Sequence, residues 1–365
     1  MITAMKIFLS IALSLCFESN SSASSEATGR SVILIIGDGM GYPQLEAASL
    51  SIYGKKQALF TQQMSHRGEI HTHSHSDEIT DSGAAATAMG TGQKTNNGYV
   101  GRNKNAVDVP NIFEIAKRSG IHTGIITTVP ISHATPAGFA SHGDDRKHTD
   151  RIVDQLLSRS RPNILFGSAE QINEKWASFK GYDVVKDRNS FMKWSPKTVT
   201  DFYVSGQFGE SNIPLYKDKN TQLPSLPELT AKALEVLPQP FFLLIESGMI
   251  DWGGHEGDIG KVISEVHALE DSVLEINDWM KNKKDVTVIV TADHETGGLI
   301  VEGPPKTPGA LPPHRFTAPL NDIGSLKHTA QKVPVFAMGA DAYRVETLDD
   351  NTELFFMMKD MLLKK

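Results

Sequence analysis

The sequence contains one cysteine among its 365 residues, and this residue, Cys16, lies in a short apolar run. The run, Ile7 to Phe17, follows Lys6 and precedes Ser21-Ser22-Ala23, an order typical of a cleavable secretory signal. It is too short to span a membrane as a helix. We therefore expect a signal peptide over residues 1–23, a periplasmic or secreted location, and a mature chain without disulfides, thiol nucleophile or membrane span.

The sequence also lacks an excess of positive charge. It has 36 Lys and Arg against 43 Asp and Glu, a formal net charge of −7 at pH 7. Nucleic-acid-binding domains usually carry a basic patch or stripe, so this balance argues against a nucleic-acid-binding role. We find no internal repeat and no long linker, and 39% hydrophobic with 22% charged residues is typical of a globular chain. Residues 24–365 are therefore predicted to form a single domain.

Short runs that are apolar on both faces predict the buried strands of a parallel sheet. Five such runs are present: Val32 to Ile36, Thr123 to Thr128, Phe241 to Ile245, Val286 to Thr291 and Val333 to Met338. Helical patterns alternate with them, over Pro110 to Ser119 and Asp258 to Lys281. The alternation predicts an α/β fold with a large, mostly parallel central sheet and helices on both faces. The aromatic, less periodic stretch over about 162–226 is predicted to be an irregular insertion on the same domain.

A serine begins a predicted helix of very small residues, in the segment Thr80-Asp81-Ser82-Gly83-Ala84-Ala85-Ala86-Thr87-Ala88. The first backbone N–H groups of a helix have no partner within it, and together with the helix dipole they favour an anion such as phosphate. Small side chains allow other backbone segments to approach closely. The alternative is an ordinary cap on a buried alanine-rich helix.

Polar residues follow three of the predicted strands at their carboxyl ends, where open α/β sheets bind ligands. They are Asp38, Glu246 and the pair Asp293-His294, and Asp251 with His255 comes shortly after the third run. Four carboxylates in one cleft are unfavourable unless cations are bound. Oxygen-plus-imidazole ligands suit zinc, whereas an all-oxygen site suits magnesium. Taken one at a time, Asp38 could be a turn residue and Asp251 with His255 a surface pair.

Together these motifs resemble those of the alkaline phosphatases. The resemblance is carried by Ile36-Gly37-Asp38-Gly39, Thr80-Asp81-Ser82, His133-Ala134-Thr135-Pro136-Ala137, Asp251 to His255, Thr291-Ala292-Asp293-His294-Glu295-Thr296-Gly297-Gly298 and His328-Thr329. Their order and spacing cover nearly the whole chain after the predicted signal. The resemblance implies an alkaline-phosphatase-like fold, hydrolysis of small phosphate monoesters with an alkaline rate optimum, and a homodimer.

The same resemblance implies two Zn²⁺, one Mg²⁺ and a role for each matching residue. Ser82 is the implied nucleophile that becomes phosphorylated, and Arg146 the implied phosphate clamp, oriented by Asp81. The implied metal ligands are Asp251, His255 and His328 for one zinc, Asp38, Asp293 and His294 for the second, and Asp38, Thr135 and Glu246 for the third metal.

Two residues depart from the best-known bacterial member of that family. His133 stands where that enzyme has an aspartate, so the third site is expected either to take zinc in place of magnesium or to bind its ion more weakly. Trp252 stands where it has a lysine, which removes a positive charge next to the bound phosphate. We expect weaker product inhibition as a result. Both features resemble the compact, often cold-adapted, marine bacterial members.

Three rival functions remain to be weighed. A phosphodiesterase of the same superfamily commonly uses a threonine nucleophile and has no matching arginine. A sulfatase needs Cys or Ser followed by x-Pro-x-Arg, which Ser82-Gly83-Ala84-Ala85-Ala86 lacks. A periplasmic zinc- or phosphate-binding protein would have no need of a nucleophile. A phosphatase therefore accounts for the most residues.

Overall fold

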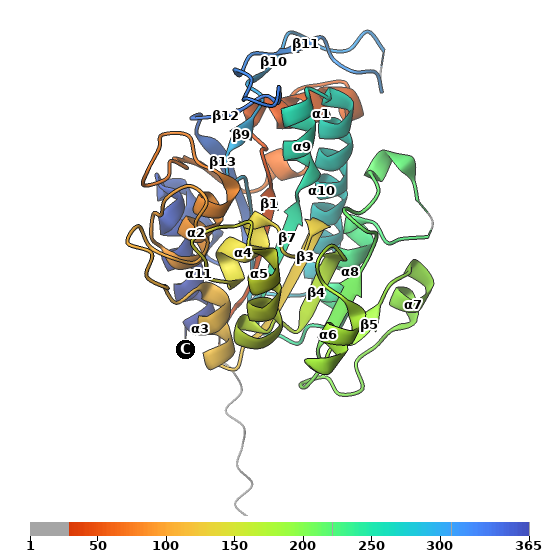
Figure 1. Cartoon of the computed structure of the whole chain (residues 1–365). Coiled ribbons are helices and arrows are strands. Elements are labelled where there is room, and N and C mark those ends of the chain that lie inside the picture. Colours follow the sequence, from red (N-terminus) through yellow and green to blue (C-terminus); the bar gives the residue numbers. More distant parts are fainter. Residues whose placement is uncertain (1–28, 221, 308, 365) are drawn as a thin grey trace, which may run out of the picture.

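The computed structural model describes residues 29–220, 222–307 and 309–364, and its centre is a nine-stranded sheet with the order β2-β13-β8-β1-β7-β3-β4-β6-β5 (Figure 1). The strands are β1 Ser31–Gly37, β2 His66–Ile70, β3 His122–Pro130, β4 Ile164–Ser168, β5 Asp183–Val185, β6 Val204–Gln207, β7 Phe241–Ser247, β8 Val286–Thr291 and β13 Val333–Gly339. Neighbouring strands are parallel, except that β13 runs antiparallel to both β8 and β2. The predicted α/β fold is confirmed.

All five strands predicted from apolar runs are present, as β1, β3, β7, β8 and β13. Every residue of β1, β7 and β8 is buried, which explains why both faces of these strands are apolar. The antiparallel direction of β13 was not predicted, because a run buried on both faces has the same composition in either direction. The expected signal peptide over residues 1–23 lies outside the described residues.

Helices cover both faces of the sheet (Figure 1). One layer consists of α1 (Tyr42–Tyr53), α8 (Leu226–Val236), α9 (Met249–Glu256) and α10 (Ile259–Met280), with α10 against β1 and β7. The other consists of α2 (Ser82–Thr91), α3 (Ile112–Arg118), α4 (Ala134–Ala140) and α11 (Asn351–Leu363), with α11 against β1. The remaining helical segments are η1 Thr61–Gln63, α5 Thr149–Gln155, η2 Leu156–Ser160, α6 Glu174–Phe179, α7 Arg188–Lys193, η3 Tyr216–Asp218 and η4 Ala342–Thr347.

The two helices predicted from periodicity are both present. Asp258 is the N-cap of α10, whose 22 residues fill the predicted range. Helix α3 begins later than Pro110, because the Asn111 side chain caps it by accepting a hydrogen bond from the Glu114 N–H. Among the described residues, no helix is both long enough and apolar enough to cross a membrane.

The stretch over about 162–226 is more regular than expected. It supplies β4, β5 and β6, three parallel strands at one edge of the central sheet. These strands have only five, three and four residues, too few for periodicity to mark them. Its description as an insertion on a single domain stays a prediction.

The carboxyl ends of β1, β7 and β8 lie side by side, because β7 and β8 flank β1. Asp38 directly follows β1. Gly248 alone separates the end of β7 from the start of α9. Beyond this edge lie two small sheets, in which β9 (Glu295–Thr296) pairs with β12 (His328–Thr329) and β10 (Leu299–Val301) pairs with β11 (His314–Phe316) (Figure 1). The β9–β12 pair brings the distant His328 to the edge of the central sheet.

Candidate metal and phosphate site

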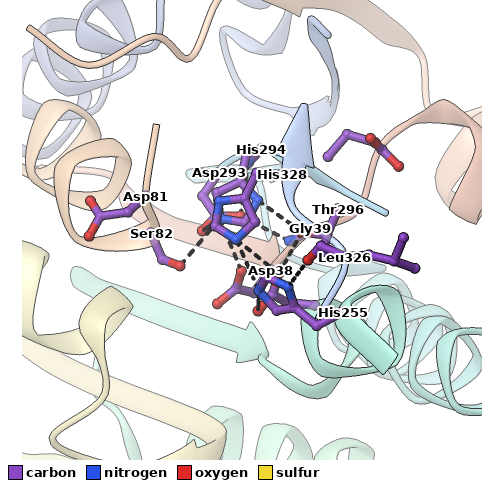
Figure 2. A network of polar contacts seen from close by, with 12 residues as sticks. Asp38, Gly39, Asp81, Ser82, His255, Asp293, His294, Thr296, Leu326 and His328 are labelled. Atoms are coloured by element: carbon purple, nitrogen blue, oxygen red, sulfur yellow. Dashed lines mark hydrogen bonds and ion pairs between the residues drawn. The ribbon is translucent and has the colours of Figure 1, made fainter. Parts of the chain in front are cut away.

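Ser82 is the first residue of α2, and its side chain is buried. Asp81 is the N-cap and accepts a hydrogen bond from the Ala84 N–H at 2.8 Å. The Ser82 Oγ lies 3.3 Å from His294 Nε2 (Figure 2). The small residues of α2 allow close packing against α4, since a Cβ added to Gly138 would lie 2.7 Å from the Ala86 Cβ. Asp81 therefore caps the helix, while the Ser82 hydroxyl beside it faces His294.

Arg146 lies beside this helix start. Its Nη1 donates to Asp81 Oδ2 at 3.1 Å, and its own N–H donates to the Gly98 carbonyl at 2.8 Å. Asp81 Oδ2 also accepts from the Gly98 N–H at 3.0 Å, so the carboxylate links the arginine to the loop before it. A cavity of about 640 Å³ opens here, with Asp81, Arg146, His133 and Trp252 among its lining residues. The structure therefore brings the expected phosphate clamp and Trp252 to one opening.

Asp38, Asp293 and His294, the residues expected to hold the second zinc, form a fully buried group, here called the second group. His294 Nε2 lies 3.2 Å from Asp293 Oδ2 and 3.6 Å from Asp38 Oδ1. Burial and the charges of neighbouring carboxylates raise the pKa of Asp38 well above its usual value, and burial raises the pKa of Asp293 to about 6. Burial and the nearby His328 lower the pKa of His294. These carboxylates are held close together against their electrostatic preference.

Asp251, His255 and His328 form the first group. The spacing of four within α9 places His255 Nε2 3.3 Å from Asp251 Oδ2, and β12 places His328 Nε2 3.5 Å from Asp251 Oδ1. Burial alone would raise the pKa of Asp251, but hydrogen bonds and charge from the two imidazoles hold it well below the usual range. Asp251 correspondingly raises the pKa of His255 to about 8 and raises that of His328, against the effect of burial.

Asp38, His133 and Glu246 form the third group. His133 Nδ1 lies 3.9 Å from Glu246 Oε1, and Thr127 on β3 donates to Glu246 Oε2 at 2.5 Å. The Thr135 side chain is fully buried in the first turn of α4. His133 also contacts Trp252, with ring centroids 6.4 Å apart.

The residues present fit divalent cations. Within the described part of the chain, several buried atoms of these groups have no hydrogen-bond partner: both carboxylate oxygens of Asp38, Asp293 Oδ2, Glu246 Oε1, His133 Nδ1 and Thr135 Oγ1. Buried carboxylate oxygens without donors are costly unless a cation binds them. The Nδ1 atoms of His255 and His328 lie at 2.5 and 2.9 Å from the carbonyls of Leu326 and Thr80, so each Nε2 is left to face the group.

Sequence reasoning missed the residues that support these groups. Thr127 lies inside a strand that was predicted only from its apolar residues, and Gly98 belongs to none of the recognised motifs. Thr296 was part of the segment that carried the family resemblance, yet nothing in its local pattern marked its hydroxyl. That hydroxyl lies between Asp251 and His294. In each case the partner is distant in sequence, so local spacing held no signal.

Fold and site define the class of the protein: an α/β protein with three groups suited to metal ions beside a serine at a helix start. The alkaline phosphatase family model matches residues 29–168 and 167–312. Alkaline phosphatase 4 of Bacillus subtilis is 33% identical over 293 residues, which cover 74% of this chain and 62% of that protein. The chain belongs to the alkaline phosphatase family, and it spans about three fifths of the length of that Bacillus relative.

Solved structures agree with this assignment. A cold-active alkaline phosphatase from Shewanella sp. matches with a TM-score of 0.80 and 25% identity, covering 92% of this chain and 100% of that one. A His-to-Asp mutant of TAB5 alkaline phosphatase with Mg bound in the M3 site matches with a TM-score of 0.76 and 26% identity, covering 93% of this chain and 99% of that one. The family resemblance expected from the motifs is confirmed.

Proposed function

We propose that this protein is a metal-dependent alkaline phosphatase that hydrolyses phosphate monoesters through a covalent phosphoserine on Ser82 and releases inorganic phosphate. The observation that carries the proposal is the position of Ser82. Its Oγ lies at a helix start, 3.3 Å from a histidine of the second group, and its N-cap neighbour Asp81 holds Arg146 at 3.1 Å. These contacts support the proposal, because the proposed nucleophile, the proposed phosphate clamp and a group suited to a metal ion lie next to one another.

Two Zn²⁺ would be held by the first and second groups, and a third ion, Mg²⁺ or Zn²⁺, by the third group with Thr135. Bound there, these ions would favour the deprotonated serine, activate water and stabilise the departing alkoxide. Asp38 belongs to both the second and the third group, so it would link two of the ions.

The remaining chemistry is assigned to this chain's own residues. The Ser82 oxygen attacks phosphorus in line, the bond from phosphorus to the ester oxygen breaks, and the alcohol leaves. Water then attacks the phosphoserine, and the serine oxygen leaves as phosphate is released. The planar fork of Arg146 would bind two non-bridging phosphate oxygens through both steps, and Asp81 would keep the fork in place.

The third group is proposed to prefer zinc. An imidazole is a softer ligand than a carboxylate, and His133 occupies this group together with Asp38 and Glu246. In the TAB5 enzyme, Mg is bound in the M3 site of a mutant whose histidine has been replaced by aspartate. His133→Asp in the present chain would therefore be expected to raise the share of magnesium over zinc at the third site.

The substrates, location and assembly are proposals as well. The cavity beside Arg146 is lined by charged and polar side chains together with apolar surface that includes Trp252, which suits small phosphate monoesters of varied alcohols. We propose a periplasmic or secreted protein, a homodimer, and no role in binding nucleic acid.

The rival phosphodiesterase and binding-protein functions are disfavoured by the arginine at 3.1 Å from Asp81 and by the serine beside His294.

The test is hydrolysis of p-nitrophenyl phosphate at about pH 9 by wild type and Ser82→Ala, before and after chelation and after restoring zinc and magnesium. Ser272→Ala is the matched control, because Ser272 is also buried but its hydroxyl, among the described residues, bonds only to the Ala268 carbonyl of its own helix. Wild-type turnover should be lost on chelation and return with metal. The turnover of Ser82→Ala should be roughly 10³-fold or more below that of wild type, whereas Ser272→Ala should match wild type.

Mass spectrometry of acid-quenched protein should also find one phosphoryl group on the peptide containing Ser82. The rate should rise toward alkaline pH. Metal-loaded wild type without turnover, or with a flat or acid-peaked rate profile, would contradict the proposal.

A further inference from the structure

Thr296 is fully buried at the meeting point of the elements that carry the first and second groups. Its N–H donates to the Gly39 carbonyl at 3.2 Å, next to Asp38, and its carbonyl accepts from Gln44 Nε2 at 2.9 Å. It pairs with His328 in the β9–β12 sheet. A Cβ on Gly254 of α9 would lie 2.9 Å from the Thr296 Cβ, so α9 packs directly on this residue. The backbone and methyl group of Thr296 are thus held on every side.

The hydroxyl of Thr296 contacts one residue of the first group and one of the second. Its Oγ1 lies 2.5 Å from Asp251 Oδ1 and 3.2 Å from His294 Nδ1. A hydroxyl has one proton to donate, and an ionised carboxylate can only accept. The Thr296 proton therefore points to Asp251. Its oxygen can then only accept from His294, which requires the proton of that imidazole to be on Nδ1.

This arrangement decides which nitrogen of His294 faces the second group. With the proton on Nδ1, the lone pair of Nε2 points toward Ser82 Oγ, Asp293 and Asp38, at 3.3, 3.2 and 3.6 Å. The two histidines of the first group, His255 and His328, have the same orientation, but the backbone carbonyls of Leu326 and Thr80 hold their Nδ1 atoms. For His294 the corresponding acceptor is a side chain, so a substitution can remove it.

We propose that Thr296 is a positioning residue whose hydroxyl couples the first and second groups, by fixing both the carboxylate of Asp251 and the tautomer of His294 for metal binding. The inference rests on the metal sites of the proposed function. Partners that orient metal ligands typically contribute about 10- to 100-fold in metal affinity. Loss of this one hydroxyl should therefore weaken zinc binding at both groups.

The experiment compares Thr296→Ala with Thr296→Ser. Both variants lack the methyl group, so the difference between them isolates the hydroxyl. Thr296→Val is unsuitable, because it would place a methyl group about where the oxygen now lies, 2.5 Å from Asp251 Oδ1. Thr230→Ala and Thr230→Ser form the matched control pair, since Thr230 is fully buried and, in the part of the chain that the structure describes, its hydroxyl bonds only to the Leu226 carbonyl of its own helix.

Zinc affinity is measured on the metal-free full chain by competition with a chromogenic chelator, and bound zinc is counted by elemental analysis. We expect Thr296→Ala to bind zinc about 10- to 100-fold more weakly than Thr296→Ser at two sites, while the two Thr230 variants match each other. Equal zinc affinities of the two Thr296 variants would overturn the inference and leave the phosphatase proposal intact. Wild type that takes up no zinc would overturn both.

A second measurement needs no folded alanine variant. Long-range ¹H–¹⁵N spectra of zinc-loaded wild type, with His294 assigned by its loss in His294→Gln, report which ring nitrogen carries the proton. We expect the proton on Nδ1. A proton on Nε2, with Nδ1 bound to metal, would overturn the inference even if Thr296→Ala fails to fold.

Discussion

Asp38 and Glu270 are both fully buried carboxylates, one at the end of β1 and the other within α10. Glu270 accepts hydrogen bonds from the Phe60 N–H, the Thr61 N–H and the Thr61 hydroxyl at 2.5, 3.1 and 2.7 Å. Neither oxygen of Asp38 has a hydrogen-bond partner among the described residues. Asp38 instead faces Asp293 and further carboxylates. Burial raises the pKa of Asp38, and the charges of these carboxylates raise it further.

The same contrast occurs between neighbours in the chain. Glu295, next to His294, accepts from Gln44 Nε2 at 2.7 Å and from the Thr329 hydroxyl at 2.6 Å. Asp293, two residues earlier, leaves Oδ2 without a donor from any described residue. Burial alone therefore does not mark a functional acid. A buried carboxylate supplied with donors holds the fold together, whereas one left without them is available to a cation.

Among the changes that test this contrast, Asp38→Asn is expected to have the largest effect on the free energy of unfolding. Zinc at 1,000 times its dissociation constant should add about 4 kcal/mol per site to the free energy of unfolding of wild type. Asp38→Asn should lose most of the gain from the second and third groups, which share Asp38, and keep the gain from the first group. In chelator it should be about 1–3 kcal/mol more stable than wild type, because a buried carboxyl group that has no donors and faces other carboxylates is gone. Urea unfolding with zinc and with chelator measures both, and the exposed Asp278→Asn is the control. A variant less stable than wild type in chelator would break the comparison.

Glu265 is an intermediate case, with Oε1 accepting from the Tyr216 N–H and the Ser264 hydroxyl at 2.9 and 3.0 Å. Burial raises its pKa from 4.5 to about 7. Between these two values the folded chain holds more protons than the unfolded chain, so the free energy of unfolding falls as pH rises through this window. Glu265→Gln should be spared this loss, which amounts to about 3 kcal/mol at most.

The measurement is urea unfolding of wild type and Glu265→Gln at several pH values between 4.5 and 8, with chelator throughout. The stability of the variant relative to wild type should grow with pH and level off above about 7. A difference that does not change with pH would show that Glu265 has an ordinary pKa in the folded chain.

Glu270→Gln tests the other side of the contrast. The amide group keeps the shape but turns one acceptor into a donor, which would face either the Phe60 N–H or the N–H and hydroxyl of Thr61. We expect a loss of about 1–3 kcal/mol in the free energy of unfolding. Because Glu270 has no part in the metal groups, the loss should be the same with zinc and with chelator. A zinc-dependent loss would place Glu270 among the residues that support metal binding.

Trp252→Lys adds a positive charge beside the cavity where phosphate is proposed to bind, and it carries the smallest expected effect. An exposed charge pair contributes up to about 1 kcal/mol, so inhibition by inorganic phosphate should strengthen roughly fivefold. Trp252→Leu is the control for the lost indole. Steady-state inhibition constants for phosphate decide the outcome, and equal constants in wild type and Trp252→Lys would rule out this role of Trp252.

Much of the fold followed from local patterns. The five buried strands were found because their two apolar faces require burial on both sides, and α10 because its apolar stripe recurs along 22 residues. The strands β4, β5 and β6 were not predicted, because they are short and lie in an aromatic stretch without a clear hydrophobic period. The direction of β13 escaped because burial does not depend on strand direction.

The sequence by itself determined the local geometry of the site. Asp81 and Ser82 stand at a helix start, Asp251 and His255 share a helix face, and Asp38 follows a buried strand; each arrangement needs only a few consecutive residues. The tertiary structure alone decided which buried acids receive donors and which nitrogen of each histidine faces a metal group. The Thr296 hydroxyl reaches Asp251 across 45 residues, and the Thr80 carbonyl reaches His328 across 248. Such contacts depend on how strands and loops meet at the sheet edge, and no short-range periodicity encodes that meeting.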